Sequence, residues 1–246
     1  MKHVLVLSDT HYPYVDRRTM EAVENLMGDY KWDEVVHLGD FLDLDCISAH
    51  NKENLRAVET KRLFYEYNEG QEVLDHWKEL APKAKFTLIE GNHEHRVQRY
   101  IDASPQLEGM IEVPVGLDLA KKKINWVPFW STGQTYDIGK ATFLHGGKTT
   151  NFHTKTMAYN YGRNIFYGHT HDVQSYSVET AGHNSTYVAQ SVGCLCKYDQ
   201  PYMRGRPSKW QQAVTVIDFY DDGFFTANVL RIFNHKFIFN RKLYQP

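Results

Sequence analysis

Acidic, amide and imidazole side chains recur in five short clusters, four of which directly follow a short apolar run that we read as a strand. The clusters are Asp9-x-His11, Gly39-Asp40-x-x-Asp43, Gly91-Asn92-His93-Glu94, His145-Gly146 and Gly168-His169-x-His171. Ligands sit beyond the strand ends of open α/β sheets, so these side chains are expected to meet in one crevice. Mixed Asp, Asn and His ligands suit Mn, Fe, Zn, Co or Ni, which predicts a metal centre.

The spacing within the clusters favours two ions rather than one. Residues two apart at an extended strand end point to the same side, so Asp9 and His11 can chelate one ion. His169 and His171 can reach adjacent ions by the same argument. Asp40 follows its strand and a glycine directly, and is the natural bridge between two cations. The glycines before Asp40, Asn92 and His169 allow sharp turns where a Cβ would obstruct the approach.

Formal charge indicates what such a centre would act on. Two divalent ions with two carboxylates, Asn92 and four neutral imidazoles keep a charge of about +2, which suits a phosphate ester. Bound metal also lowers the pKa of water towards roughly 7, so hydroxide is available at neutral pH. Taken singly, Asp9 or Asp40 could be a helix N-cap, Asn92 a turn residue and His145 a buried core histidine. Their order and strand context together favour the metal site.

Hydrophobic periodicity places these clusters in an α/β protein. The first half alternates strands and helices. The expected elements are strands at 2–7, 34–38 and 85–89 and helices at 17–27 and 55–80. The second half is richer in strands. We expect strands at 123–128, 134–138, 140–145, 164–167, 173–178, 185–191, 213–219 and 224–230, a helix at 153–161 and one more strand within 233–243. A turn at Asp221-Asp222-Gly223 should join the last two long strands. Two facing sheets in a single domain, residues 1–246, fit best.

Composition narrows the function classes. A net charge of −2 over 246 residues gives no global basic excess that demands a nucleic-acid partner. No apolar stretch approaches the roughly 18 residues that span a bilayer, so no membrane association is expected. The first ten residues lack a cleavable leader pattern and the three cysteines form no disulfide framework, so we expect a cytoplasmic protein. Oligomeric state is left open.

The ordered set of five clusters resembles the calcineurin-like metallophosphoesterase superfamily. The resemblance covers residues 9 to 171 with every motif intact, and the later strands fit that family's second sheet. It implies a four-layer α/β/β/α sandwich with two facing mixed β-sheets. It also implies hydrolysis of a phosphate ester by a hydroxide that bridges two divalent metal ions.

The resemblance assigns roles residue by residue. Its two ligand sets are Asp9, His11, Asp40 and His171 for one metal and Asp40, Asn92, His145 and His169 for the other. His93 would be a histidine that faces the scissile ester without binding metal, and Asp43 would orient it.

Departures from the subfamilies bear on the substrate. Serine/threonine protein phosphatases of this superfamily carry arginines where this chain has Leu44 and Glu90, which puts that activity in doubt. The repair nucleases and cyclic-nucleotide phosphodiesterases usually have Asp where Glu94 stands, and the lipid-A-pathway pyrophosphohydrolases have Arg where His93 stands. We expect a phosphodiesterase acting on nucleotides or nucleic acid. The alternatives are a small-molecule phosphomonoesterase or pyrophosphatase, or a scaffold without catalysis like the retromer subunit of this superfamily.

Four basic residues are candidates for substrate contact. Arg96 follows the Gly91-Asn92-His93 cluster and Lys148 follows His145. Arg204 and Arg206 lie in a segment, 197–210, where basic and aromatic residues interleave. Such a segment can hold nucleotides, although a charged surface loop explains it slightly better.

Overall fold

Two mixed β-sheets form the centre of the computed structural model, which describes residues 1–51, 58–179, 186–200, 203 and 205–246. The first sheet has the strand order β11-β10-β1-β2-β3-β4, and β1 to β4 run parallel. Its strands are β1 (Lys2–Leu7), β2 (Glu34–His37), β3 (Lys85–Ile89), β4 (Asn125–Val127), β10 (Ala213–Phe219) and β11 (Phe225–Arg231).

The second sheet has the order β5-β6-β7-β9-β8, with β6, β7 and β9 parallel and antiparallel strands at both edges. Its strands are β5 (Tyr136–Ile138), β6 (Ala141–Leu144), β7 (Asn164–Tyr167), β8 (Ser175–Glu179) and β9 (Thr186–Ser191). The predicted pair of mixed sheets is therefore confirmed, with β1, β3, β7 and β10 matching their expected ranges.

Alternation along β1 shows why the sheet is covered on both faces. Val4 and Val6 pack in the core shared with the second sheet, whereas Leu5 and Leu7 pack against the helices. Successive strand side chains point to opposite faces, so an uninterrupted apolar run implies burial on both sides. The strand thus belongs to the middle of a layered molecule.

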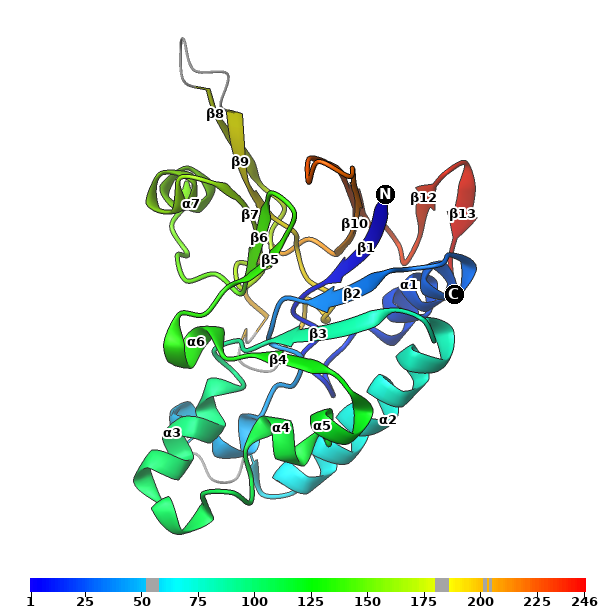
Figure 1. Cartoon of the computed structure of the whole chain (residues 1–246). Coiled ribbons are helices and arrows are strands. Elements are labelled where there is room, and N and C mark those ends of the chain that lie inside the picture. Colours follow the sequence, from blue (N-terminus) through cyan, green and yellow to red (C-terminus); the bar gives the residue numbers. More distant parts are fainter. Residues whose placement is uncertain (52–57, 180–185, 201–202, 204) are drawn as a thin grey trace.

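Helices complete the outer layers. They are α1 (Arg17–Asp29), α2 (Leu63–Leu80), α3 (His95–Ala103), α4 (Val113–Gly116), α5 (Leu119–Lys122), α6 (Phe129–Thr132) and α7 (His153–Tyr161). In Figure 1, α1 and α2 lie along the first sheet and α7 lies beside β7 to β9, against which it packs. The order helix, sheet, sheet, helix is the four-layer sandwich expected from the sequence.

Two expected elements differ from the structure by more than a shift of one or two residues at an end. The helix expected over 55–80 begins at Leu63, because Arg62 is extended at φ −140° and ψ 137°; residue 55 lies outside the described residues. The single strand expected within 233–243 is instead a hairpin of β12 (Phe237–Phe239) and β13 (Lys242–Tyr244). Asn240 and Arg241 form its turn at positive φ, a left-handed pair of the kind that two-residue hairpins require.

The parallel strands deliver the polar clusters to one place. The carboxyl ends of β1, β2 and β3 lie side by side in the first sheet, and those of β6 and β7 in the second. Each of these ends is followed by one of the five clusters. Parallel pairing therefore brings the five polar clusters, which are spread over residues 9 to 171, together at one edge of both sheets.

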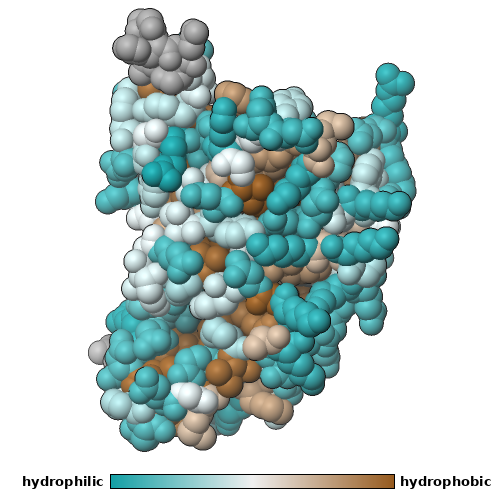
Figure 2. Space-filling model, in the orientation of Figure 1, coloured by the Kyte–Doolittle hydropathy of each residue, from teal (hydrophilic) through white to brown (hydrophobic). Residues whose placement is uncertain are grey.

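The surface in Figure 2 is mostly polar, with apolar areas interrupted by polar side chains. Within the described residues, no helix combines the length and the apolar character needed to cross a bilayer.

Two helical glycines should respond oppositely to replacement by alanine. A Cβ on Gly70 of α2 would lie 2.7 Å from Leu117 Cδ2 and 3.0 Å from Leu42 Cδ2, whereas one on the exposed Gly28 of α1 would meet only Leu80 Cδ2 at 3.5 Å. We expect Gly70→Ala to lower the free energy of unfolding by about 1–3 kcal/mol through overpacking. Gly28→Ala should raise it by up to about 1 kcal/mol. Urea unfolding measures both, and equal effects would contradict the packing described.

Candidate metal centre

The seven candidate ligands lie on the turns that follow β1, β2, β3, β6 and β7. Five of them, Asp9, His11, Asp40, His169 and His171, have positive φ values between 50° and 68°. The expectation that Asp9 and His11 sit on an extended strand end is therefore wrong. The left-handed backbone, not strand periodicity, aims both side chains into the same crevice.

The first group of side chains matches the first predicted ligand set. Asp9, His11, Asp40 and His171 are buried, and each places one ligand atom within 4.8 Å of the others. His171 Nε2 lies 3.0 Å from Asp9 Oδ1 and 3.2 Å from His11 Nε2. His11 Nε2 lies 3.7 Å from Asp40 Oδ2.

The second group shares Asp40 with the first. Asp40, His145 and His169 also place ligand atoms within 4.8 Å of one another. Asp40 Oδ2 lies 3.3 Å from His145 Nε2, while its Oδ1 accepts a hydrogen bond from the His93 amide at 2.9 Å. Asn92 Oδ1 lies 3.1 Å from His145 Nε2 and 2.8 Å from His169 Nδ1. One oxygen of Asp40 thus faces both groups.

Hydrogen bonds behind the imidazoles decide which nitrogen faces the crevice. His145 Nδ1 donates to the Leu38 carbonyl at 2.9 Å, so Nε2 is the nitrogen directed at Asp40. His11 Nδ1 lies 3.2 Å from Asp43 Oδ1, so its Nε2 also points inward. His171 Nδ1 lies 3.8 Å from Cys196 Sγ. This contact of Cys196 was not predicted from the sequence.

The charges fit a cation. Burial alone would raise the pKa of Asp9, yet His171 and His11 hold it well below its usual value. Burial likewise lowers the pKa of His145, but Asp40 outweighs it and brings the pKa to about 9. Buried carboxylates therefore draw positive charge onto imidazoles whose inward nitrogens face one another. A divalent ion supplies that charge without a proton, so this donor set fits metal binding.

His93 stands beside this centre without joining either group. Its Nδ1 donates to the Asp43 backbone carbonyl at 2.8 Å, and the Asp43 carboxylate lies 3.3 Å from the same nitrogen. Asp43 therefore contacts His93 as predicted, mainly through the carbonyl. Arg96 donates from Nη1 to that carbonyl at 2.6 Å and from Nη2 to His93 Nε2 at 3.1 Å. Burial keeps the pKa of His93 below its usual value, so the ring is neutral at pH 7.

Glu94 holds two of the turns together. Its Oε2 accepts hydrogen bonds from the amides of Asp40 and Gly91, and its Oε1 accepts one from Leu42, each at 2.9 Å. Burial, followed by the negative charge of Asp40, raises the pKa of Glu94 to about 7. This role of Glu94 was not predicted from the sequence, in which Glu94 served only to distinguish subfamilies. The one signal was a carboxylate directly after His93.

His37 links the end of β2 to the end of β1. Its Nδ1 accepts from the Gly39 amide at 3.2 Å, and Thr10 Oγ1, 3.1 Å from its Nε2, donates to the Phe41 carbonyl. Burial lowers the pKa of His37 to about 3, so it stays neutral. This histidine positions the turn that carries Asp40 rather than binding a ligand itself.

An open cleft of about 500 Å³ leads to the centre. Its lining includes His93 and Arg96 as well as Asp45, Ser48, Asn51 and Trp210, whose ring centroid is 4.2 Å from that of His171. Arg96 is thus placed where the sequence expected it. Lys148 and Arg206 are exposed, and neither lines the metal cleft or another of the cavities found in the described part of the chain. Arg204 lies outside the described residues.

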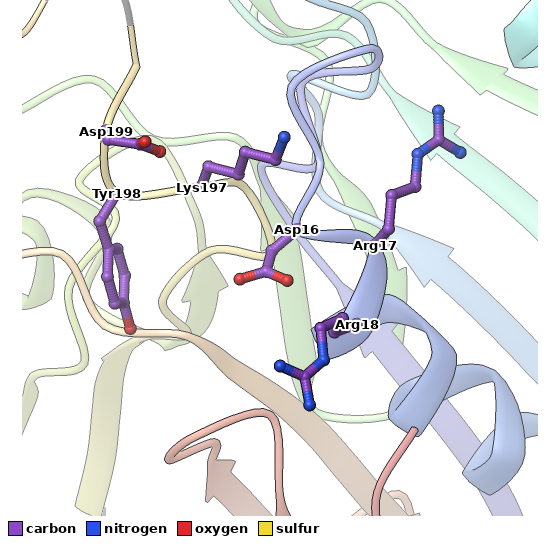
Figure 3. Close-up of a pocket in the computed structure, with 6 residues that line it drawn as sticks. All are labelled: Asp16, Arg17, Arg18, Lys197, Tyr198 and Asp199. Atoms are coloured by element: carbon purple, nitrogen blue, oxygen red, sulfur yellow. The ribbon is translucent and has the colours of Figure 1, made fainter.

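A cavity of about 560 Å³ at the start of α1 also carries basic side chains. Figure 3 shows that Arg17 extends away from Asp16 and Lys197, and its guanidinium pairs with Glu69. Asp16 accepts hydrogen bonds from the Thr19 amide at 3.1 Å and from Gln212 Nε2 at 3.0 Å. Because the cations do not converge, this cavity offers no second anion site, and Lys197 lines this cavity rather than the metal cleft.

Comparison with known proteins gives the family. The model of the calcineurin-like phosphoesterases matches residues 2–216. The chain belongs to the calcineurin-like phosphoesterase family. It is 24% identical over 243 residues to the Gene 54 protein of Mycobacterium phage L5 and 25% identical over 233 residues to that of phage D29. These matches cover 88% of this chain and of the L5 protein, and 85% and 86% for D29.

Solved structures resemble the chain more distantly. A single mutant of Vps29 from Entamoeba histolytica is 14% identical with a TM-score of 0.48, covering 99% of this chain and 98% of that one. Nuclease MPE from Pseudomonas putida is 12% identical with a TM-score of 0.43, covering 99% of this chain and 87% of that one.

The close approach of β7 to β1 yields a test of the metal centre. A Cβ on Gly168 would clash with Ser8 Oγ and the Asp9 carboxylate, whereas one on Gly147 would meet nothing within 4 Å. We expect Gly168→Ala to displace Asp9 and lower the bound metal of protein purified with Mn²⁺, and Gly147→Ala to leave it unchanged. Metal analysis by mass spectrometry measures both. Full metal content in Gly168→Ala would show that Asp9 is not needed as a ligand.

Proposed function

We propose that this chain is a dinuclear metal-dependent phosphodiesterase whose substrates are nucleotide or nucleic-acid phosphodiesters. The observation that carries the proposal is the pair of ligand groups joined by Asp40 Oδ2, with His93 and Arg96 in the adjoining cleft. Two ions held by Asp9, His11, Asp40 and His171 and by Asp40, Asn92, His145 and His169 would supply Lewis acidity and a nucleophile at neutral pH. Mn, Fe, Zn, Co and Ni all suit these ligands.

The protein's own residues would hold the ester. Arg96 donates through two of its five N–H groups to Asp43 and His93, so the others are available to a phosphate oxygen. His93 is fixed by the Asp43 carbonyl, and its Nε2 is the nitrogen on the cleft side. While Arg96 donates to it, Nε2 carries no proton; once Arg96 turns to the phosphate, Nε2 would take a proton from water and donate it to the leaving oxygen.

The positions of the missing arginines support a diester. Leu44 is fully buried, and both carboxylate oxygens of Glu90 accept hydrogen bonds from Ser131, at 2.7 Å and 2.6 Å. Neither position presents a cation to the cleft. A monoester dianion would then lack the bidentate grip of the protein phosphatases, which a diester with one negative charge needs less.

Replacing His93 tests the catalytic assignment. We expect His93→Asn to lower kcat on bis(para-nitrophenyl) phosphate by about 10²–10⁴ while metal content holds, because the ring acts on the ester and not on the ions. Asp43→Asn keeps the backbone carbonyl that fixes His93, so this substitution should lower kcat by a smaller factor. A fall in metal content with His93→Asn would make His93 a ligand and reject the assignment.

A substrate panel tests the diester preference. With Mn²⁺ at matched pH, kcat/KM should be higher for bis(para-nitrophenyl) phosphate and for DNA or RNA than for phosphoserine peptides. The reason is the absent arginine pair at Leu44 and Glu90. A higher kcat/KM on phosphopeptides would reject the preference, and a higher value on para-nitrophenyl phosphate would make the chain a phosphomonoesterase instead. If none of these esters is hydrolysed, the proposal that the chain is an enzyme is rejected.

A further inference from the structure

A second cavity, of about 290 Å³, adjoins the metal cleft. His169 and Trp210 line both, so the two spaces share a wall formed by a candidate metal ligand and an aromatic ring. The rest of its lining comes from the turn before α7, from the turn after β7 and from residues 203 and 208–210. A ligand held at the metals therefore has a neighbouring compartment one side chain away.

Charge in this cavity favours an anion. Lys209 Nζ donates to the neutral Asn151 Oδ1 at 2.9 Å, and within the described part of the chain it has no carboxylate partner. The one acid in the lining, Asp172, is already engaged by His153 at 3.0 Å and by Gln174 Nε2 at 2.6 Å. The N-terminal, positive end of α7 begins at His153 beside it.

Trp210 adds a surface for a planar group. It is partly exposed, and it lies next to His171 in the lining of the metal cleft. Aromatic side chains that stand next to a basic groove stack the bases of single-stranded nucleic acids without sequence preference. The hydroxyl and amide groups of Thr150, Asn151 and Ser208 complete a polar compartment of the size of a nucleotide fragment.

We infer that this cavity binds the nucleotide next to the scissile phosphate of a single-stranded substrate, with Lys209 on its phosphate and Trp210 against a base. The inference rests on the proposed phosphodiesterase function and narrows its substrate to a chain at least two nucleotides long. The inference also changes which residues of the segment 197–210 are expected to bind substrate. In place of Arg206, the contacts come from Lys209 and Trp210.

Binding can be measured separately from hydrolysis. The probe is a fluorescein-labelled ten-nucleotide oligothymidylate, followed by anisotropy with Ca²⁺ in place of Mn²⁺. Lys209→Gln should weaken binding about fivefold and lower the salt dependence of log Kd by roughly 0.7–1, the loss of one phosphate contact. Lys83→Gln is the matched control, because this exposed lysine precedes β3 at the opposite end of the strands. It should leave both quantities unchanged.

Trp210→Ala should weaken binding between about fivefold and a hundredfold, and Trp210→Phe should restore most of it, as base stacking requires. Equal affinity and equal salt dependence in Lys209→Gln and Lys83→Gln would overturn the inference, as would a wild-type chain that does not bind the oligonucleotide. Wild-type hydrolysis of bis(para-nitrophenyl) phosphate judges the proposed function on its own. Its absence alongside Lys209-dependent binding would reject the enzyme but retain the site.

Discussion

The three hydrogen bonds on the Glu94 carboxylate tie together the turns that carry the metal centre. They join the amides of Asp40 and Leu42, after β2, to the amide of Gly91, after β3. Parallel pairing brings strand ends close, but it leaves the following turns without a ladder. There, a buried carboxylate that accepts hydrogen bonds from backbone amides of two turns takes the place of the β-ladder hydrogen bonds. These bonds, together with the bond from the His93 amide to Asp40 Oδ1, fix the relative positions of Asp40, Asn92 and His93.

Within the candidate metal centre, too, single residues contact several groups at once. Asp40 accepts the His93 amide with one oxygen and faces both ligand groups with the other. Asp43 contacts His93 through its carbonyl and His11 through its carboxylate. Residues that share contacts in this way are energetically coupled, so the free-energy changes caused by single substitutions among them will not be additive. Ligand positions, the orientation of His93 and the placement of Arg96 are therefore properties of one network.

Residue types and order were sufficient to predict the fold class and which candidate ligands lie close together, because both depend on local patterns. Short apolar runs ending in polar clusters imply parallel strands, and parallel strands imply one shared edge. Other features depend on contacts that no local pattern encodes. Glu94, Cys196 and Trp210 acquire their roles from partners 25 or more residues away. The terminal hairpin was read as one strand because Asn240-Arg241 lacks the glycine that usually marks such a turn.

The left-handed backbone at the ligands explains why so many supports surround them. Holding a non-glycine residue at positive φ costs on the order of 1–3 kcal/mol, and five of the seven candidate ligands are held so. Isolated turns would relax out of that conformation. They keep it because neighbouring groups fix them from outside. His169 donates its amide to the Asp9 carboxylate at 3.0 Å, and His11 donates its amide to the Asp40 carbonyl at 3.0 Å. Each ligand turn is thereby held by the next, so the crevice forms only when both sheets are in place.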